Sequence, residues 1–545
     1  MKFKRWIALY VVEIAWLFYM AGLLLALLPY IQQPFEEMGD IALISRQVHL
    51  ASEWDVLRGA YSRLGFFHIG PISFYWMALI DFILPSSLFA ENSHYYQYAI
   101  SIWLANTFIG LISLRSARRL GLSIGSRLML LVFTIVFLWH LGGHVLFSPW
   151  GPHLTILPIL WLCLNLIRAG QADFTALPGL ALSSIWILHS HAGSLTFLGP
   201  SLVFLFYLWY RLYRNGELII SRLTWPFTLG LLIVFTGISI PVYEAFINDG
   251  GNLKAIFEYL DKNSTWRKPG KALVFMLSAM DGPFRNGIPI IAPVAALLYA
   301  IWGRKKLEVT EKRILALCLI LTFGSFYGAL RTPGVLVPHL FDHLLPVNAL
   351  LLAINLRPLF MALSRYPLKN WFANSNSKFQ SRGLLQSGQP REDSSPPEQI
   401  HPGRFGYLIL VFPFALLLLG ISRDSHPPES RFQPAAILNS LLHRVDLKDA
   451  SRAIYRIGLS QENLVHWPGA AGLILQMERR GYRACIDPPF DILFGPETLC
   501  PARVNGTILI EPAPENPKMK HGNAFIYHNI QVEFRPENRE NAEIE

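Results

Sequence analysis

The sequence is poor in charged residues, which make up only 15% of its 545 positions, whereas a soluble globular protein carries about a quarter. Repeated apolar runs take their place, and roughly 20 apolar residues are enough to cross a bilayer as a helix. This composition argues against a soluble protein and predicts a polytopic membrane protein. The first run, residues 6–29, lacks a small-residue cleavage site, so we expect it to be a retained anchor.

Cysteine is also scarce, with four in the chain. Cys163 and Cys318 lie in apolar runs and are expected to be small buried hydrophobes. Cys485 and Cys500 lie in the polar C-terminal part and could form a disulfide if that part is outside the cytoplasm. Two cysteines alone establish neither a bridge nor a zinc site, which needs more ligands nearby.

The net charge of +10 is unevenly distributed. From Ser422 onward, 14 basic and 16 acidic residues nearly cancel, so the basic excess belongs to the apolar part. There it falls in short loops, as the positive-inside rule expects, at Lys2/Lys4/Arg5, Arg115/Arg118/Arg119, Arg211/Arg214 and Arg304/Lys305/Lys306. These residues are explained as topology determinants, and we expect no nucleic-acid partner.

Run length and loop charge together predict about eleven membrane helices. They fall near residues 6–29, 95–114, 127–145, 153–168, 176–192, 195–212, 225–243, 287–302, 313–330, 338–356 and 405–421. The Lys/Arg clusters fall at every second connection, which predicts a cytoplasmic N-terminus. Because the number of helices is odd, the C-terminal part is then predicted to lie outside.

One apolar run is predicted not to cross. If residues 69–84 spanned the membrane, the arginines at 115–119 would face outside, so we expect an amphipathic helix on the membrane surface. Residues 30–94 then form one long external loop. Residues 244–285 form a second external stretch, with an amphipathic piece at 253–260 and an apolar piece at 272–280.

Of two segments near the C-terminus, one is predicted to be disordered and the other to be folded. Residues 366–404, rich in Ser, Gln, Pro and Asn, are typical of a disordered cytoplasmic linker. Residues 422–545 indicate a soluble α/β domain. Its expected helices are 435–457 and 469–481, and its expected strands are 463–465, 482–486 and 507–510.

The external loop opens with the acids Glu36, Glu37 and Asp40, close to the predicted membrane edge. Transfer of a sugar to a hydroxyl or amine needs a general base, and a carboxylate at this depth suits that role. Acids are also common at helix N-termini, and spacing alone favours that simpler interpretation.

A second cluster follows in the stretch RGAYSRLGFFHIGP, which places Arg58, Tyr61, Arg63 and His68 together. Arginine binds phosphate oxygens in pairs, so this cluster suits a lipid phosphate. Anchoring of Arg and aromatic side chains among lipid headgroups explains the same composition equally well.

These stretches resemble the first-loop signature of integral-membrane GT-C glycosyltransferases, and most closely an uncharacterised bacterial branch of them. The resemblance is carried by GDIALISRQV, GAYSRLGFFHIGPISFYW, SPWGPHLTILP, ILHSHAG and VHWPGAAGLILQMERRGYRACID. Related superfamily members include protein O-mannosyltransferases and aminoarabinose transferases. Ala60 and Ile69 stand where the pattern has proline, which makes the backbone there less rigid.

The resemblance implies a GT-C-like α-helical membrane domain over residues 1–365, a last membrane helix at 405–421 and a periplasmic α/β domain at 422–545, in a bacterial inner membrane. It implies a polyprenyl-phosphate sugar donor surrounded by membrane lipid. The acceptor would be an envelope glycan, lipid or protein.

Carried onto this sequence, the resemblance makes Asp40 the catalytic carboxylate, with Glu37 second. Arg63 and His68 would contact the donor phosphate or sugar. Arg63, with Arg58 or Arg331, would stabilise the departing phosphate as its negative charge builds.

External helix ends also offer histidines, among them His339 and His343, which would share a helix face. We expect His343 and its neighbours to line the cavity and assign no metal ligands. No cofactor is predicted, and a divalent metal remains open.

Two other functions fit a polytopic chain: a transporter or lipid flippase, and a non-enzymatic scaffold. A long first loop and a large external domain favour an enzyme, and the paired halves frequent in transporters are not visible in the sequence. An enzyme predicts Asp40 in a cavity open to the outside and to the lipid, whereas a transporter predicts a central pathway.

Overall fold

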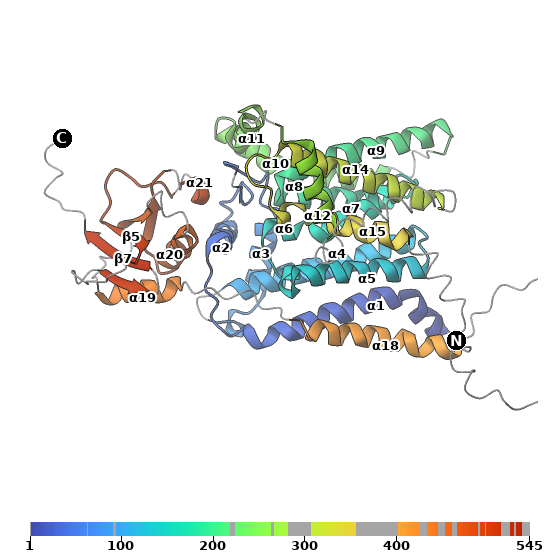
Figure 1. Cartoon of the computed structure of the whole chain (residues 1–545), viewed down its shortest axis with the longest axis horizontal. Helices are drawn as coiled ribbons and strands as arrows, with labels where there is room; N and C mark the ends of the chain where they lie inside the picture. The colour runs from blue at the N-terminus through green and yellow to red at the C-terminus, as the bar shows by residue number, and fades with distance from the viewer. Residues whose placement is uncertain are drawn as a thin grey trace, which may run out of the picture.

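The computed structural model describes residues 2–62, 64–90, 94–217, 224–262, 266–281, 307–355, 402–423, 433–444, 453–459, 466–488, 491–495, 498–513, 524–527 and 530–536. This part is mostly helical, with a bundle at one end and a strand-containing C-terminal domain at the other (Figure 1). Seven of its helices are long and apolar enough to cross a membrane: Tyr10–Tyr30, Tyr95–Arg119, Ile124–Leu141, Gly151–Ala169, Ala192–Arg214, Thr224–Ile247 and Val309–Arg331.

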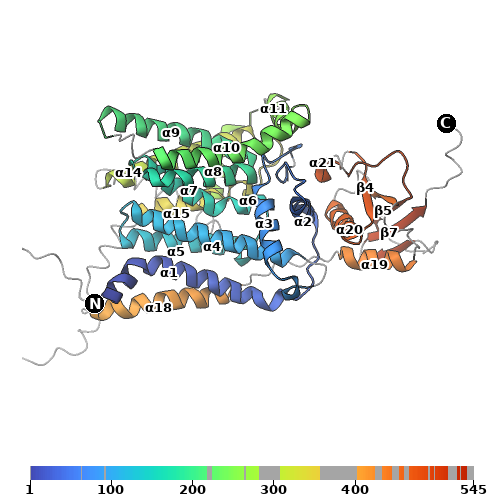
Figure 2. The same cartoon turned by 180° about the vertical axis from the view of Figure 1, so that it is seen from behind.

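The helices of the bundle run alongside one another (Figures 1 and 2). Helix α7 lies at its centre, since every residue from Ile156 to Ala169 is buried. The bundle comprises α1 (Lys2–Leu27), α4 (Tyr95–Arg119), α5 (Ile124–Leu141), α6 (Gly151–Leu154), α7 (Ile156–Ala169), α8 (Leu177–Ser190), α9 (Leu195–Arg214), α10 (Thr224–Ile247), α14 (Val309–Arg331), α15 (Leu344–Asn355) and α18 (Pro402–Ile421).

Seven of the eleven predicted spans thus correspond to long apolar helices. Three others, near 176–192, 338–356 and 405–421, contain shorter apolar helices. The span predicted at 287–302 lies outside the described residues, as does nearly all of the predicted linker at 366–404.

The first and last helices of the bundle pack backbone against backbone. A Cβ added at Gly22 of α1 would lie 2.2 Å from the carbonyl oxygen of Leu417, and one at Gly420 of α18 would lie 2.5 Å from that of Tyr19. Only residues without a side chain allow helices to approach this closely, as is frequent between membrane helices. This contact brings the start of the C-terminal domain to the same end of the bundle as the first loop (Figure 2).

The first loop is structured and lies at that end (Figures 1 and 2). It contains α2 (Gly39–Ser52), the antiparallel hairpin of β1 (Tyr61–Ser62) and β2 (Phe66–Phe67), and α3 (Ile72–Ile83). The predicted helix within 69–84 is therefore present, and its 12 residues are too few to span about 30 Å of hydrocarbon. The stretch 244–285, which was predicted to be external, contains α11 (Gly251–Lys262) and α12 (Pro269–Asp281).

The C-terminal domain has a five-stranded mixed sheet in the order β4-β3-β5-β7-β6. Strands β4, β3 and β5 are parallel, while β7 pairs antiparallel with β5 and β6. The elements are α19 (Pro434–Arg444), β3 (Ile454–Leu459), α20 (Trp467–Arg479), β4 (Arg483–Ile486), α21 (Asp491–Phe494), β5 (Gly506–Pro512), β6 (Ala524–Tyr527) and β7 (Ile530–Pro536).

The predicted helix at 435–457 is wrong at its end, because residues 454–457 belong to β3. Alternating burial along β3 shows that its apolar residues follow a strand period. The predictions at 469–481, 482–486 and 507–510 are confirmed by α20, β4 and β5, whereas the strand predicted at 463–465 lies outside the described residues. Cys485 and Cys500 form a disulfide, and Cys163 and Cys318 are buried and free.

Candidate functional site

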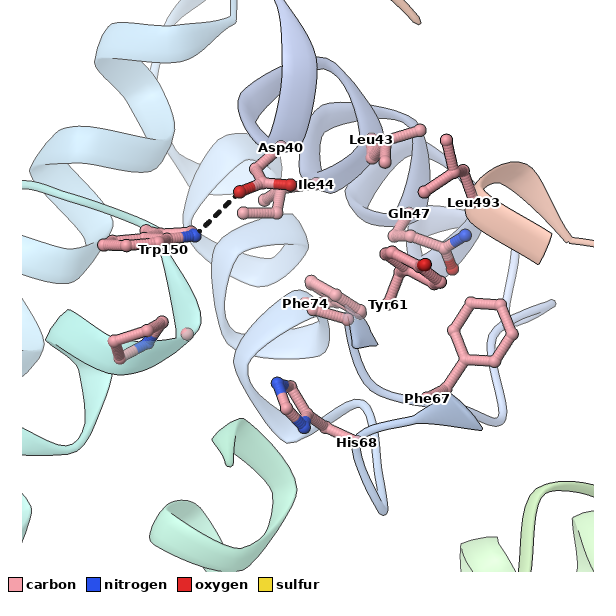
Figure 3. Close-up of a pocket in the computed structure, with 13 residues that line it drawn as sticks. Asp40, Leu43, Ile44, Gln47, Tyr61, Phe67, His68, Phe74, Trp150 and Leu493 are labelled. Atoms are coloured by element: carbon pink, nitrogen blue, oxygen red, sulfur yellow. Dashed lines mark hydrogen bonds between the residues drawn. The ribbon is translucent and has the colours of Figure 1, made fainter. Parts of the chain in front are cut away.

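A small cavity lies where the first loop, the bundle and the C-terminal domain meet (Figure 3). Three parts of the chain that are distant in sequence contribute to it: residues 40–74, residues 150–152 and Leu493. The lining residues are Asp40, Leu43, Ile44 and Gln47 of α2, Ala60, Tyr61, Phe67 and His68 of the hairpin region, Phe74 of α3, Trp150, Gly151 and Pro152 around the start of α6, and Leu493 of α21.

Asp40 lies in the first turn of α2, where the free backbone N–H groups favour a carboxylate. The indole N–H of Trp150 donates a hydrogen bond of 3.0 Å to Oδ2 of Asp40. Among the described residues no donor reaches Oδ1. Surrounding protein atoms desolvate the carboxylate and raise its pKa, and the Trp150 hydrogen bond opposes that rise. Asp40 is thus a carboxylate with one oxygen available and a pKa moved toward neutrality.

Trp150 is itself held by rings on two other elements. Its ring centroid lies 4.5 Å from that of His339 and 4.9 Å from that of His153. Its backbone N–H donates to the hydroxyl of Ser148 at 3.3 Å. The donor to Asp40 therefore has a fixed position, which a loop tryptophan lacking such contacts would not have.

Tyr61 and His68 lie on the hairpin side of the cavity (Figure 3). Burial, and then the negative charge of Asp40, raise the pKa of Tyr61, so its hydroxyl stays protonated and can donate. Burial lowers the pKa of His68 to about 3, so the imidazole is neutral at neutral pH. Its Nδ1 accepts a 3.2 Å hydrogen bond from the backbone N–H of Ala192, which leaves Nε2 to carry the proton.

Two motif glycines permit this close packing. A Cβ at Gly70 would lie 2.4 Å from the ring of His189, and one at Gly151 would lie 2.8 Å from the carbonyl oxygen of Ser190. Both glycines therefore let the hairpin and the start of α6 close against the end of α8. Three of the five stretches that carry the sequence resemblance thus contribute lining residues, and ILHSHAG packs against two of those three.

Glu37, the second predicted catalytic acid, does not line this cavity. It is fully buried, forms an ion pair with Arg479 of α20 and accepts a 2.9 Å hydrogen bond from Ser45. Its carboxylate links α2 to the C-terminal domain.

The predicted phosphate-binding residues are dispersed. Arg58 forms a 2.7 Å ion pair with the buried carboxylate of Glu244, and Arg331 lies 5.3 Å from the ring centroid of Trp266. His343 is buried against Ser325, 2.8 Å away. None of the three lines the cavity, and Arg63 lies outside the described residues.

Ten of the 13 lining residues were absent from the predicted site, among them Gln47, Trp150 and Leu493. Trp150 belongs to SPWGPH, one of the stretches of the resemblance, so that motif could have suggested it. Gln47 lies seven positions after Asp40 and so on the same face of a helix. Leu493 carries no signal in the sequence, because only the docking of the C-terminal domain brings it here.

A large apolar groove lies beside the site. Its volume is about 1030 Å³, and it is formed by the end of α2 and by α3, α4, α7 and α8. Among its lining residues are Trp76, Leu79 and Phe82 of α3. Phe74 of the same helix lines the Asp40 cavity, so α3 separates the two spaces.

In the part of the chain that the structure describes, no three His, Cys, Asp or Glu side chains are grouped as a metal site. The chain matches no protein-family model and no curated protein.

Proposed function

We propose that the protein is a membrane glycosyltransferase of the GT-C type, which transfers a sugar from a polyprenyl-phosphate donor to an envelope acceptor on the periplasmic side. The observation that supports this most directly is the placement of Asp40 in a polar cavity at the end of the bundle, next to a large apolar groove. This arrangement suits a reaction between a lipid-borne donor and a water-borne acceptor.

In the proposed reaction, an acceptor hydroxyl or amine attacks the anomeric carbon of the donor sugar. The bond from that carbon to the phosphate oxygen breaks, and polyprenyl phosphate leaves with the electron pair. Asp40 takes the acceptor proton through Oδ1, while Trp150 holds Oδ2. The raised pKa of Asp40 makes it a better base than an exposed aspartate.

The groove supplies a place for the polyprenyl chain. Its lining is almost entirely apolar, and α3 stands between it and the Asp40 cavity. A chain lying along the outer face of α3 would carry its phosphate around the end of that helix toward Tyr61 and His68. The Tyr61 hydroxyl and the His68 Nε2–H are neutral donors that can bind phosphate oxygens.

The experiment uses a strain that lacks the gene, complemented with wild type, Asp40→Asn or Asp55→Asn. Asp55 is an exposed acid of the same loop and serves as the matched control. Mass spectrometry of envelope glycans, lipids and proteins should show a sugar that is lost in the deletion strain. Wild type and Asp55→Asn should restore it, while Asp40→Asn should not and should accumulate the lipid-linked donor. Full restoration by Asp40→Asn would remove Asp40 from the mechanism.

A flippase gives the same pattern in cells if Asp40 is needed for transport. Purified protein in detergent separates the two functions, because detergent leaves no membrane to transport across. A glycosyltransferase should still form the product from an extract of lipid-linked sugars and the acceptor identified in cells. Transport activity in vesicles without product in detergent would identify a flippase instead.

A further inference from the structure

The C-terminal domain reaches the Asp40 cavity through one short segment, residues 485–500, which the Cys485–Cys500 disulfide closes. Within it, Leu493 of α21 lines the cavity beside Gln47 of α2 (Figure 3). The next residue, Phe494, is 1% exposed and belongs to the core of the C-terminal domain. Leu493 thus belongs to a segment whose ends are joined by the disulfide and whose next residue, Phe494, packs in the core of the C-terminal domain.

Polar contacts hold this segment on α2. Arg46 donates a 2.7 Å hydrogen bond to the carbonyl oxygen of Phe494 and forms a 3.0 Å ion pair with Glu478. Glu37, two residues before α2, and Arg479 of α20 form a second ion pair. The helix that begins with Asp40 is therefore fixed to the domain that carries Leu493.

Apolar packing adds to these contacts. Ala42 and Leu43 of α2 belong to the same buried cluster as Ile437, Ile474 and other core residues of the C-terminal domain. A Cβ at Gly472 of α20 would lie 2.6 Å from the carbonyl oxygen of Glu37. So close an approach makes α2 and the C-terminal domain one packing unit.

We propose that the C-terminal domain is the outer wall of the site, and that Leu493 is the specificity-determining residue that limits the size of the acceptor reaching Asp40. This assignment of an acceptor rests on the proposed function. The other walls are α2, the hairpin, α3 and the start of α6, all of which belong to the membrane domain. Leu493 is the one lining residue, among those described, that the C-terminal domain contributes.

The test measures access to the cavity with thiol reagents of two sizes. Gln47→Cys places a reporter thiol in the cavity of the full-length, oxidised protein in detergent, and Cys163 and Cys318 are buried enough to give little background. A small methanethiosulfonate should label this thiol readily and a bulky maleimide slowly. Leu493→Ala should raise the rate of bulky labelling severalfold, and Leu493→Trp should lower the rate for both reagents.

Two controls make the result specific. Leu499→Ala is the same substitution in the same disulfide-closed segment, at a side chain that is 41% exposed and outside the cavity, and it should change neither rate. A thiol at His49→Cys, on the exposed face of α2, should be labelled at the same rate in every variant and so calibrates the reagents. Unfolding would be recognised by labelling of the buried Cys163 and Cys318. Equal bulky labelling in Leu493→Ala and Leu499→Ala would overturn the proposal.

The acceptor assignment has its own readout. Leu493→Ala should raise transfer to an enlarged analogue, such as the same acceptor carrying a bulky tag, relative to transfer to the natural acceptor. No gain of the tagged product, despite faster bulky labelling, would refute size selection by Leu493. The labelling rates do not depend on sugar transfer. If the Asp40→Asn prediction fails, they still test whether Leu493 limits access to the cavity.

Discussion

The indole N–H of Trp150 donates a 3.0 Å hydrogen bond to the carboxylate of Asp40, although 110 positions separate the two residues. The bond joins the start of α2 to the turn before α6. It stabilises the ionised carboxylate and so lowers its pKa against the effect of burial.

Trp150→Phe keeps the ring and removes the donor, so the pKa of Asp40 should rise. The acid limb of the pH–rate profile should then move to higher pH by about half to one unit, because a hydrogen bond to a charged group is worth roughly 1.5 kcal/mol and cavity solvent offsets part of it. The measurement is transfer rate against pH in detergent. Trp54→Phe, at an 81% exposed tryptophan of the same loop, is the control. An unshifted limb would show that Trp150 has no influence on the titrating group.

Removing the Glu37 carboxylate should destabilise the protein, because it weakens the contact between the first loop and the C-terminal domain. Glu37→Gln leaves Arg479 without its ion-pair partner, and breaking a buried pair from one side costs about 3–5 kcal/mol. Thermal stability in detergent should fall for Glu37→Gln and for Arg479→Gln, and the double variant should lose less than the sum of the two. Additive losses in this double-mutant cycle would mean that the two side chains are not coupled.

Protonation of His68 should destabilise the folded protein in mild acid. The pKa of His68 is about 3 in the folded state and 6.5 in an ordinary environment. Because the folded state favours the neutral imidazole, the stability of the folded protein is highest above pH 6.5 and falls as the pH drops from 6.5 toward 3. Near pH 5 the loss is about 2 kcal/mol.

Thermal unfolding should show this loss as a smaller drop in stability between neutral pH and about pH 5 for His68→Gln than for wild type. Glutamine can still accept the hydrogen bond from the Ala192 N–H. His49→Gln, whose side chain is 69% exposed, should behave as wild type. A His68→Gln profile that parallels wild type would mean that His68 does not titrate with unfolding.

Glu13 should matter for stability inside the bundle. Its buried carboxylate lies 3.5 Å from both Arg118 of α4 and Arg127 of α5. Glu13→Gln leaves two cations facing each other in an apolar region, at a cost of about 3 kcal/mol. Heating in detergent, followed by size-exclusion chromatography, should show less monodisperse protein than for Glu258→Gln, which removes only a solvent-exposed ion pair. Equal recovery of the two variants would argue that the Glu13 cluster is not stabilising.

Much of the fold follows from local sequence patterns. Long apolar runs predict α1, α4, α5, α9, α10 and α14, because a continuous apolar stretch of this length has few alternatives to a membrane helix. The helix predicted within residues 69–84 is present as the short helix α3, and its position on the membrane surface stays a prediction. Strands β6 and β7 were missed, since their stability comes from pairing with distant β5 rather than from local preference.

The site was only partly predictable. Asp40, Tyr61 and His68 do line one cavity, and each belongs to a stretch singled out from the sequence. Glu37 could not be distinguished from Asp40 by spacing, because what separates them is Arg479, 442 positions away. By its sequence context, Arg58 likewise suits a phosphate, but in the structure it forms an ion pair with Glu244 of α10.

The packing of Gly22 against Gly420 has a consequence for biosynthesis. The first helix emerges from the ribosome long before its partner α18, and the Asp40 cavity gains its Leu493 wall later still. The site is therefore completed only by the last quarter of the chain, after the Cys485–Cys500 bond can form. A truncated or reduced nascent chain would hold Asp40 in an open cavity. The order of synthesis therefore delays completion of the site until the C-terminal domain has been made.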